Sequence, residues 1–130
     1  MARRFIQFLP LGLLALVAAC ATGPSGPQVP VYVVFFTPFS SELDADAQTV
    51  VADASRAATT APGRTVTVAG YANPTPAPGI SLVLSQQRAK TVADALAAAG
   101  VRRDRITIAP RGISGGDPGI ESRRVEILFP

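Results

Sequence analysis

Hydrophobic and polar positions along residues 31–60 first follow the pattern of a buried strand and then that of an amphipathic helix. Residues 31–36 form a continuous run of β-branched and aromatic side chains, which predicts a strand that is buried on both faces. Asp44 then stands at the N-cap of a helix predicted over residues 45–59, and Asp46 adds negative charge to its first turn. Apolar residues recur in this helix at the expected spacing: Ala47, Val50, Val51, Ala54 and Ala58.

A second strand and a second helix follow in the same way. Residues 64–71 alternate threonine with valine, as expected for a strand, and the three prolines in residues 73–79 predict a loop. From Ser81 the pattern is helical again, and the helix is expected to end at Gly100. The stripe predicted to face the core comprises Leu82, Ala89, Val92, Ala93 and Leu96.

The C-terminal part of the chain predicts two more strands. Residues 105–109 and residues 123–129 have the composition of strands, and residues 112–119 between them form a glycine-rich turn region. In the last strand three apolar side chains share one face: Val125, Ile127 and Phe129. The order βαβαββ predicts an α+β fold, a two-layer sandwich in which two helices cover one face of a mixed four-stranded sheet.

Residues 1–19 have the layout of a secretory signal peptide. A basic head, Met1–Arg4, precedes an apolar run over residues 5–17 that is too short to span a membrane. Small residues then lead up to Cys20. An incidental thiol near a signal is one interpretation, but the arrangement resembles the lipobox of bacterial lipoproteins, which implies that Cys20 is acylated. Residues 20–30 then comprise the acylated cysteine and a Pro/Gly-rich tether.

The composition excludes several kinds of chemistry. The 130 residues include no His, no Trp and a single Cys, so no histidine base, zinc site or internal disulfide can be assembled. The sequence pI of about 9.8 indicates a basic protein. However, Arg3 and Arg4 belong to the signal peptide, and without them ten basic residues face nine acidic ones, a net charge of +1. Because the remaining arginines are scattered among acids, we exclude nucleic acid as a partner.

The remaining polar side chains argue against an enzyme. The serines have no histidine partner, and the single lysine, Lys90, lies on the polar face of the second predicted helix. The cluster of Glu42, Asp44 and Asp46 could form an acid pair, but its position at a helix start favours capping. We therefore expect no catalysis and no bound metal or cofactor.

Arg88 is the candidate binding residue that the pattern of the second predicted helix indicates. Most arginines at such a helical position are solvated or paired, which is one interpretation. The other follows from topology, because the loop at residues 73–79 and the start of the second helix should lie at the same end of the sheet. A guanidinium placed there can grip a carboxylate with two hydrogen bonds.

Four segments of the chain resemble the OmpA-like peptidoglycan-binding domain. They are Val68-Ala69-Gly70-Tyr71, then Leu84-Ser85-Gln86-Gln87-Arg88-Ala89 with Val92 and Leu96, then Val101-Arg102-Arg103-Asp104-Arg105-Ile106, and finally Arg123-Arg124-Val125-Glu126-Ile127. The resemblance covers nearly all of residues 31–130. It implies the same βαβαββ fold, because that family, which includes peptidoglycan-associated lipoproteins and the periplasmic part of flagellar stator proteins, shares this order.

The resemblance also implies a site for the peptidoglycan stem peptide. In the family, the Asp of a Gly-His-Thr-Asp or similar tetrad is followed fifteen positions later by an Arg. The Asp carboxylate holds the ammonium of diaminopimelate, and the Arg guanidinium holds its carboxylate. Here the tetrad reads Gly70-Tyr71-Ala72-Asn73, and Arg88 keeps the spacing. The implied ligand-binding residues are Arg88, Asn73, Tyr71, Ala72 and Arg124. Asn73 replaces the family's Asp, and the alternative is that Asn73 is a simple turn residue before Pro74.

These observations predict an outer-membrane lipoprotein whose periplasmic OmpA-like domain binds peptidoglycan noncovalently and tethers the envelope. By resemblance to other lipoproteins, Ala21 after the acylated cysteine implies sorting to the outer membrane of a Gram-negative cell. Acids of the family are missing at Asn73 and also in Phe35-Phe36-Thr37-Pro38-Phe39. These departures leave an alternative function, an OmpA-fold scaffold or interaction module for envelope proteins that has lost peptidoglycan binding.

Overall fold

The computed structural model describes residues 30–74, 77–113 and 119–130, so the predicted signal peptide and Cys20 lie outside the described residues. The elements are β1 (Tyr32–Phe35), α1 (Ala45–Thr60), β2 (Val66–Ala72), α2 (Pro78–Ala98), the 3-10 turn η1 (Arg103–Arg105), β3 (Ile106–Ile113), the 3-10 turn η2 (Ile120–Ser122) and β4 (Arg124–Leu128). The sheet order is β1-β4-β2-β3, in which only β2 and β3 pair in parallel. The predicted α+β fold with the order βαβαββ is confirmed.

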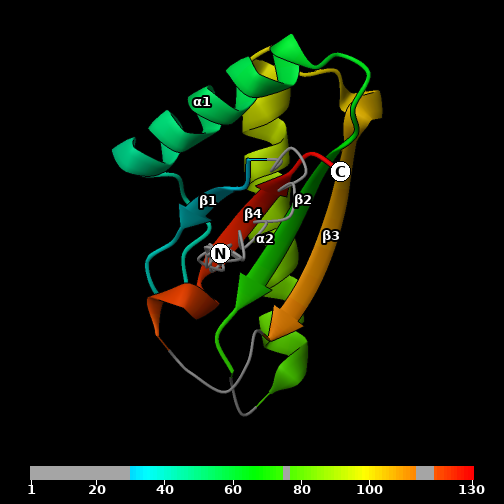
Figure 1. Cartoon of the computed structure of the whole chain (residues 1–130). Coiled ribbons are helices and arrows are strands. Elements are labelled where there is room, and N and C mark those ends of the chain that lie inside the picture. Colours follow the sequence, from blue (N-terminus) through cyan, green and yellow to red (C-terminus); the bar gives the residue numbers. More distant parts are fainter. Residues whose placement is uncertain (1–29, 75–76, 114–118) are drawn as a thin grey trace, which may run out of the picture.

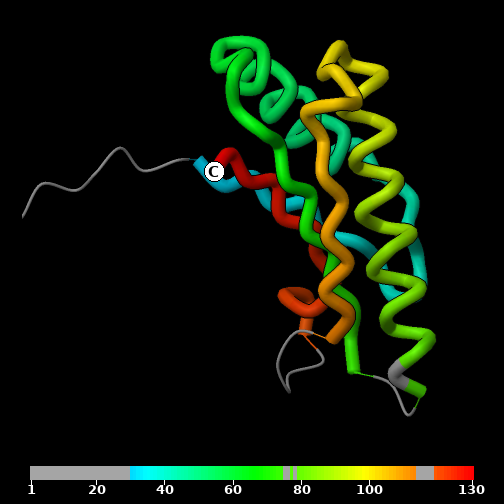
Figure 2. Tube along the Cα trace, turned by 90° about the vertical axis from the view of Figure 1, so that its right-hand side faces the viewer, coloured from blue at the N-terminus to red at the C-terminus, as the bar shows by residue number. Residues whose placement is uncertain are grey.

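Both α-helices cover the same face of the sheet (Figure 1). Figure 2, turned by 90°, shows α2 along one side of the strands. Helix α2 packs on β2 and β3, while α1 packs on β1 and on α2. Small and branched side chains fill the core between the layers, among them Val34, Val51, Ala54, Val68, Val92, Leu96, Val125 and Ile127. None of the helices described here has the length and apolar character that crossing a membrane requires.

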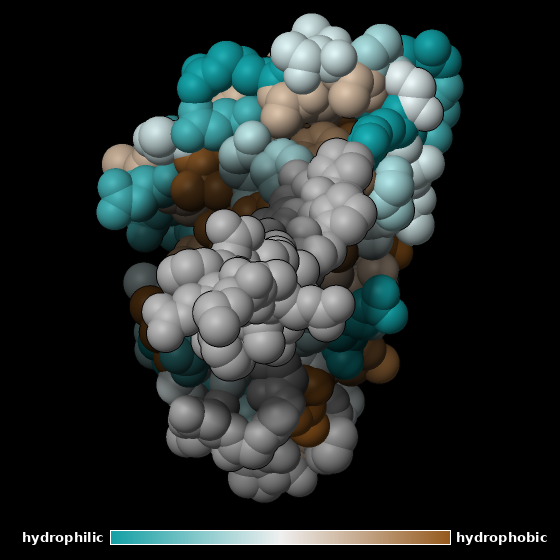
Figure 3. All heavy atoms as spheres, in the orientation of Figure 1, coloured by the Kyte–Doolittle hydropathy of each residue, from teal (hydrophilic) through white to brown (hydrophobic). Residues whose placement is uncertain are grey.

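Helix α1 forms where its sequence pattern predicts it. The Asp44 carboxylate accepts a hydrogen bond from the Ala47 N–H at 2.8 Å, which confirms Asp44 as the N-cap. The predicted apolar stripe is buried or half-buried along its whole length: Ala47, Val50, Val51, Ala54 and Ala58. The opposite face of α1 meets solvent, and hydrophilic side chains cover the upper part of the molecule in Figure 3, where this helix lies.

Arg105 closes the C-terminal end of α1, whose last turn has no basic residue of its own. Its Nη2 donates to the carbonyls of Ala58 and Ala61 at 3.0 and 2.8 Å, and its Nε donates to the Arg64 carbonyl at 2.9 Å. The bond to Ala58 satisfies a carbonyl in the last turn of α1, and the bonds to Ala61 and Arg64 hold the turn that follows the helix. Because Arg105 directly precedes β3, it fastens the end of α1 to the edge of the sheet.

Helix α2 differs from the prediction in its first residue and in one member of its buried stripe. It begins at Pro78, within the segment 73–79 that the sequence predicts as a loop, because proline suits the first helical position, where no N–H is needed. Leu82, predicted on the buried stripe, is instead 49% exposed. Polar side chains take its place on the core-facing side: Ser81, Ser85 and Arg88. The other predicted members of the stripe are buried as expected: Ala89, Val92, Ala93 and Leu96.

Two strands also differ from their predicted form. β1 lies at an edge of the sheet, and Phe35 is 42% exposed, so the prediction that this strand is buried on both faces is wrong. β3 continues to Ile113, beyond its predicted end at residue 109, because it stays paired with β2. A register shift between Gly70 and Tyr71 absorbs an extra residue of β3. The predicted inner face of the last strand is confirmed by three buried side chains: Val125, Ile127 and Phe129.

Gly70 marks a very close approach of β2 to α2. A Cβ atom at this position would lie 2.1 Å from the Ser85 carbonyl oxygen and 3.0 Å from the Ala89 Cβ. The first of these neighbours is helix backbone, so it cannot give way unless the helix moves. Gly70 therefore allows α2 to lie directly against the end of β2.

We expect Gly70→Ala to lower the free energy of unfolding by about 3 kcal/mol, because the added methyl group collides with backbone atoms. Urea unfolding followed by far-UV circular dichroism measures the change. Gly63→Ala is the matched control, since a Cβ there meets nothing within 4 Å. Its effect should stay below about 0.5 kcal/mol. Equal unfolding midpoints for the two variants would contradict this account of the packing.

Candidate functional site

Arg88 is completely buried on α2, with 0% of its surface exposed. Its Nε donates to the Ser40 carbonyl at 2.8 Å, its Nη1 to the Tyr71 carbonyl at 3.2 Å, and its Nη2 to the Thr37 carbonyl at 3.2 Å. The guanidinium also lies over the Phe36 ring, 5.3 Å from the ring centroid. Within the described residues Arg88 is therefore neither solvated nor paired with a carboxylate, so the first interpretation of its position is wrong.

The Arg88 guanidinium keeps hydrogen-bonding capacity after these contacts. A guanidinium has five N–H groups, and three of them are used by the three carbonyls, so two remain for a further acceptor. Burial and, to a smaller extent, the positive charge of Arg123 lower the pKa of Arg88 from its ordinary value to about 10. Arg88 is still charged at neutral pH, and an anion beside it would offset both effects.

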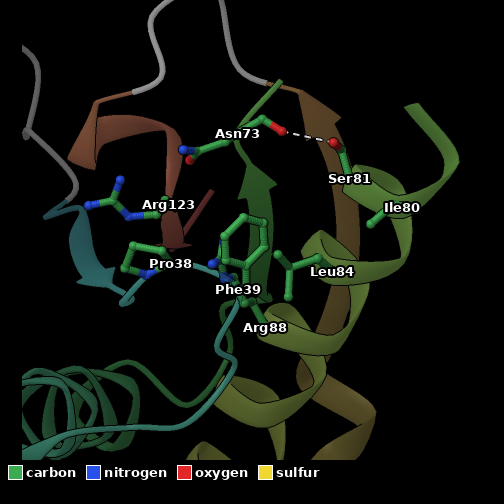
Figure 4. A pocket seen from close by; sticks show the side chains of 8 residues that line it. All are labelled: Pro38, Phe39, Asn73, Ile80, Ser81, Leu84, Arg88 and Arg123. Atoms are coloured by element: carbon green, nitrogen blue, oxygen red, sulfur yellow. Dashed lines mark hydrogen bonds between the residues drawn. The ribbon is translucent and has the colours of Figure 1, made fainter. Parts of the chain in front are cut away.

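A cavity of about 30 Å³ adjoins the Arg88 side chain (Figure 4). A water molecule needs roughly 10–15 Å³ of such space, so the cavity suits about two oxygen-sized groups. Its lining comes from the loop after β1, the end of β2, the first turns of α2 and the residue before β4: Pro38, Phe39, Asn73, Ile80, Ser81, Leu84, Arg88 and Arg123. Two arginines and no acid are among these described lining residues, a combination that favours an anionic group.

Asn73 lines the same cavity, directly after β2. Its main-chain carbonyl accepts a hydrogen bond from Ser81 Oγ at 2.8 Å, which joins the end of β2 to the first turns of α2 (Figure 4). The side-chain oxygen Oδ1 is buried and accepts no hydrogen bond from the described residues, although Asn73 has other partners. The fold thus brings together Asn73 and Arg88, the two predicted residues that lie fifteen positions apart in the sequence.

The side chains of the other predicted residues do not line the cavity. The Tyr71 side chain points to the opposite face of the sheet, where the Arg124 guanidinium lies 4.1 Å from its ring centroid. Glu126 completes this cluster, because its carboxylate accepts from Arg124 Nε at 2.7 Å and from the Tyr71 hydroxyl at 3.4 Å. Ala72 is buried within the fold. Tyr71 reaches the site only through its carbonyl, which binds Arg88.

Two residues that sequence reasoning missed, Phe39 and Arg123, line the cavity. Arg123 directly precedes β4 and its side chain lines the cavity, whereas the next residue, Arg124, begins β4 and lies over the Tyr71 ring. The Arg123 Nε also donates to the Phe36 carbonyl at 3.1 Å. The sequence signal for Phe39 is only that of an aromatic residue in a loop, directly after Pro38.

We expect Arg88→Met to lower the free energy of unfolding by about 2–4 kcal/mol, because three carbonyls lose their donor at once. Urea unfolding again provides the measurement. Arg56→Met is the control, since the Arg56 side chain is 75% exposed and its ion pair with Asp53 should contribute at most about 0.5 kcal/mol. If both variants unfolded at the wild-type midpoint, Arg88 would not hold the site together. Because of this structural role, loss of ligand binding in an Arg88 variant cannot by itself identify a binding residue.

Three solved structures resemble this chain over most of its length. The peptidoglycan-associated lipoprotein from Burkholderia pseudomallei matches with a TM-score of 0.70 at 21% identity, covering 76% of this chain and 90% of that chain. The C-terminal domain of Helicobacter pylori MotB matches with a TM-score of 0.66 at 21% identity, covering 78% and 84%. The OmpA-like domain of FopA1 from Francisella tularensis matches with a TM-score of 0.65 at 24% identity, covering 75% and 70%. At these identities the likeness shows the fold.

The family follows from the sequence itself. No curated protein matches the chain. The sequence profile of the OmpA family, in contrast, matches residues 35–121, which is more than half of the chain and includes both Asn73 and Arg88. Domains of this family are non-enzymatic peptidoglycan-binding modules of the cell envelope. This chain therefore belongs to the OmpA family and carries an OmpA-like domain of the peptidoglycan-binding type.

Proposed function

We propose that this protein is a lipid-anchored outer-membrane protein whose periplasmic OmpA-like domain binds peptidoglycan noncovalently. In this proposal the Arg88 guanidinium receives a carboxylate of the stem peptide, and Asn73 lies beside that carboxylate. Tyr71 supports the site through its carbonyl, while Ala72 and Arg124 hold the end of β2 in place from the two faces of the sheet. Acyl chains on Cys20 fix the other end of the protein in the membrane.

One observation carries this proposal, the buried Arg88 side chain with two N–H groups left over beside a cavity that no described acid lines. A buried cation is costly unless it is neutralised or fully hydrogen-bonded. A carboxylate in the cavity would neutralise the charge and accept the two remaining N–H groups, as arginine–carboxylate pairs commonly do.

Asn73 should weaken the grip on diaminopimelate relative to the family's Asp. Its amide can accept a hydrogen bond from the ligand's ammonium, but this bond lacks charge assistance, which contributes about 1–2 kcal/mol. That difference corresponds to about a ten- to thirtyfold change in affinity. A single domain is therefore expected to bind weakly, and many copies in one membrane would compensate through avidity.

The proposed anchor at Cys20 limits where the domain can act. Each buried methylene of an acyl chain adds about 0.8 kcal/mol of membrane affinity, so several chains hold a protein on the membrane essentially permanently. At about 3.1 Å per extended residue, residues 21–30 reach at most about 30 Å. The domain would therefore stay close to the membrane and bind only the peptidoglycan nearest to it.

We expect Asn73→Asp to bind purified peptidoglycan about ten- to thirtyfold more tightly than the wild type, because a carboxylate restores charge assistance to the ligand's ammonium. Co-sedimentation of the full chain, in detergent, with diaminopimelate-containing peptidoglycan measures the affinity. Gln48→Glu is the matched control, because it makes the same change of charge at an exposed position of α1 and should leave binding unchanged.

The same assay separates the two candidate functions. Weak but saturable retention of the wild type supports wall binding. Retention of Asn73→Asp alone would contradict the proposal and favour the envelope scaffold, since binding would have been lost with the acid. Retention of neither protein would contradict wall binding as well.

We expect labelled palmitate to be incorporated into the wild type in growing cells and to be absent from Cys20→Ser, because acylation begins at the thiol. Ser25→Ala, a change in the neighbouring tether, should keep the label and serves as the control. Gel electrophoresis with fluorography reads out the modification. Label on Cys20→Ser, or its absence from the wild type, would refute the lipid anchor.

A further inference from the structure

An apolar groove along α2 adjoins the Arg88 cavity. Its volume is about 410 Å³, and it is lined by Phe39, Gly79, Ile80, Val83, Leu84 and Gln87. Cavity and groove, together called the hollow below, are neighbours, because three residues line both of them: Phe39, Ile80 and Leu84. The volume falls within the range of small-ligand sites, roughly 300–1,000 Å³. The hollow is therefore large enough for a residue or two of a peptide beside the guanidinium.

The hollow is cationic at one end and apolar along the rest. Among its described lining residues the only charged side chains are Arg88 and Arg123, and none is acidic. An ammonium group placed against the apolar wall of Phe39, Ile80 and Val83 would lose hydration without gaining a charged partner among the described lining residues. Asn73 offers it only a neutral carboxamide. The charge pattern thus complements a ligand that has a carboxylate next to an apolar group.

Phe39 governs access to the guanidinium. Its ring lies in front of Arg88 in Figure 4 and is part of the lining. The Phe39 backbone has a φ of 57°, in the left-handed region that bulky residues rarely adopt, and the carbonyls of Thr37 and Ser40 around it are held by Arg88. Because Phe39 is 82% exposed, its ring can turn aside with little loss of buried contact.

We infer that this hollow selects a peptide end with one carboxylate, a small apolar side chain and no free ammonium, such as an alanine-terminated stem peptide, over zwitterionic diaminopimelate. The inference rests on the proposed function, because it specifies which part of the peptidoglycan the same site binds. The terminal carboxylate occupies the cavity and accepts the remaining N–H groups of Arg88. The adjoining methyl groups lie in the groove against Phe39, Ile80 and Val83, and the preceding amide is neutral, so it needs no acid at Asn73.

Soluble probes distinguish the two specificities. Isothermal titration calorimetry of the full chain in detergent compares N-acetyl-D-alanyl-D-alanine, which has a single carboxylate, with diaminopimelate. We expect the acetylated dipeptide to bind at least about tenfold more tightly. The same dipeptide with a C-terminal amide lacks the carboxylate and should show no measurable binding.

Variants of exposed residues test the apolar wall without disturbing the core. Ile80→Ser should weaken binding of the dipeptide by about threefold or more, because it removes apolar contact from a side chain that is 60% exposed. Ile120→Ser, at a comparably exposed position that lines neither space, is the matched control and should leave the affinity unchanged. Asn73→Asp should reverse the preference, because its carboxylate attracts an ammonium and repels the dipeptide carboxylate.

Several results would overturn the inference. These are equal or tighter binding of diaminopimelate by the wild type, binding of the amidated dipeptide, or an unchanged dipeptide affinity in Ile80→Ser. Retention on peptidoglycan without binding of the dipeptide would overturn the inference alone and leave the proposed function standing. Failure to bind the dipeptide, diaminopimelate and peptidoglycan would overturn both.

Discussion

The domain depends on one buried guanidinium. Arg88 reaches from α2 to the carbonyls of Thr37, Ser40 and Tyr71, and so fixes the loop after β1 and the end of β2 against the helix. Gly70 makes this arrangement possible, because any larger residue would push α2 away from β2. Carbonyl dipoles stabilise a buried cation without cancelling its charge, so the contacts that hold this end of the fold together also leave it electropositive.

In the proposed site, this double role leaves the charge of Arg88 available to an anionic ligand. In the related family pattern an Asp stands where this chain has Asn73, and that Asp would be expected to balance the guanidinium. Here the balance is missing among the described lining residues, and Arg123 adds a second positive charge. The neighbouring wall is apolar, with Phe39 held in a left-handed backbone conformation next to the carbonyls that Arg88 binds. Among their described lining residues, cavity and groove together combine two arginines with an apolar wall and no acid.

Adjacent arginines in this chain serve different parts of the molecule. Arg124 lies over the Tyr71 ring and pairs with Glu126 on the sheet face away from α2. Arg123, one residue earlier, lines the cavity on the helix side. Arg123 lies in the turn before β4 and Arg124 begins the strand, so these neighbouring arginines reach different parts of the molecule.

Local patterns in the sequence predicted the order of the elements, the inner faces of α1 and the last strand, and the N-cap of α1 at Asp44, because periodicity and capping depend on residues close together in the chain. The resemblance further predicted that Asn73 and Arg88 would meet. The burial of Arg88 and the exposure of Leu82, in contrast, depend on how distant segments pack together. An arginine can be buried only where acceptors surround it, and two of its acceptors, at Thr37 and Ser40, come from residues 51 and 48 positions away in the chain. No local pattern of apolar residues records such a contact.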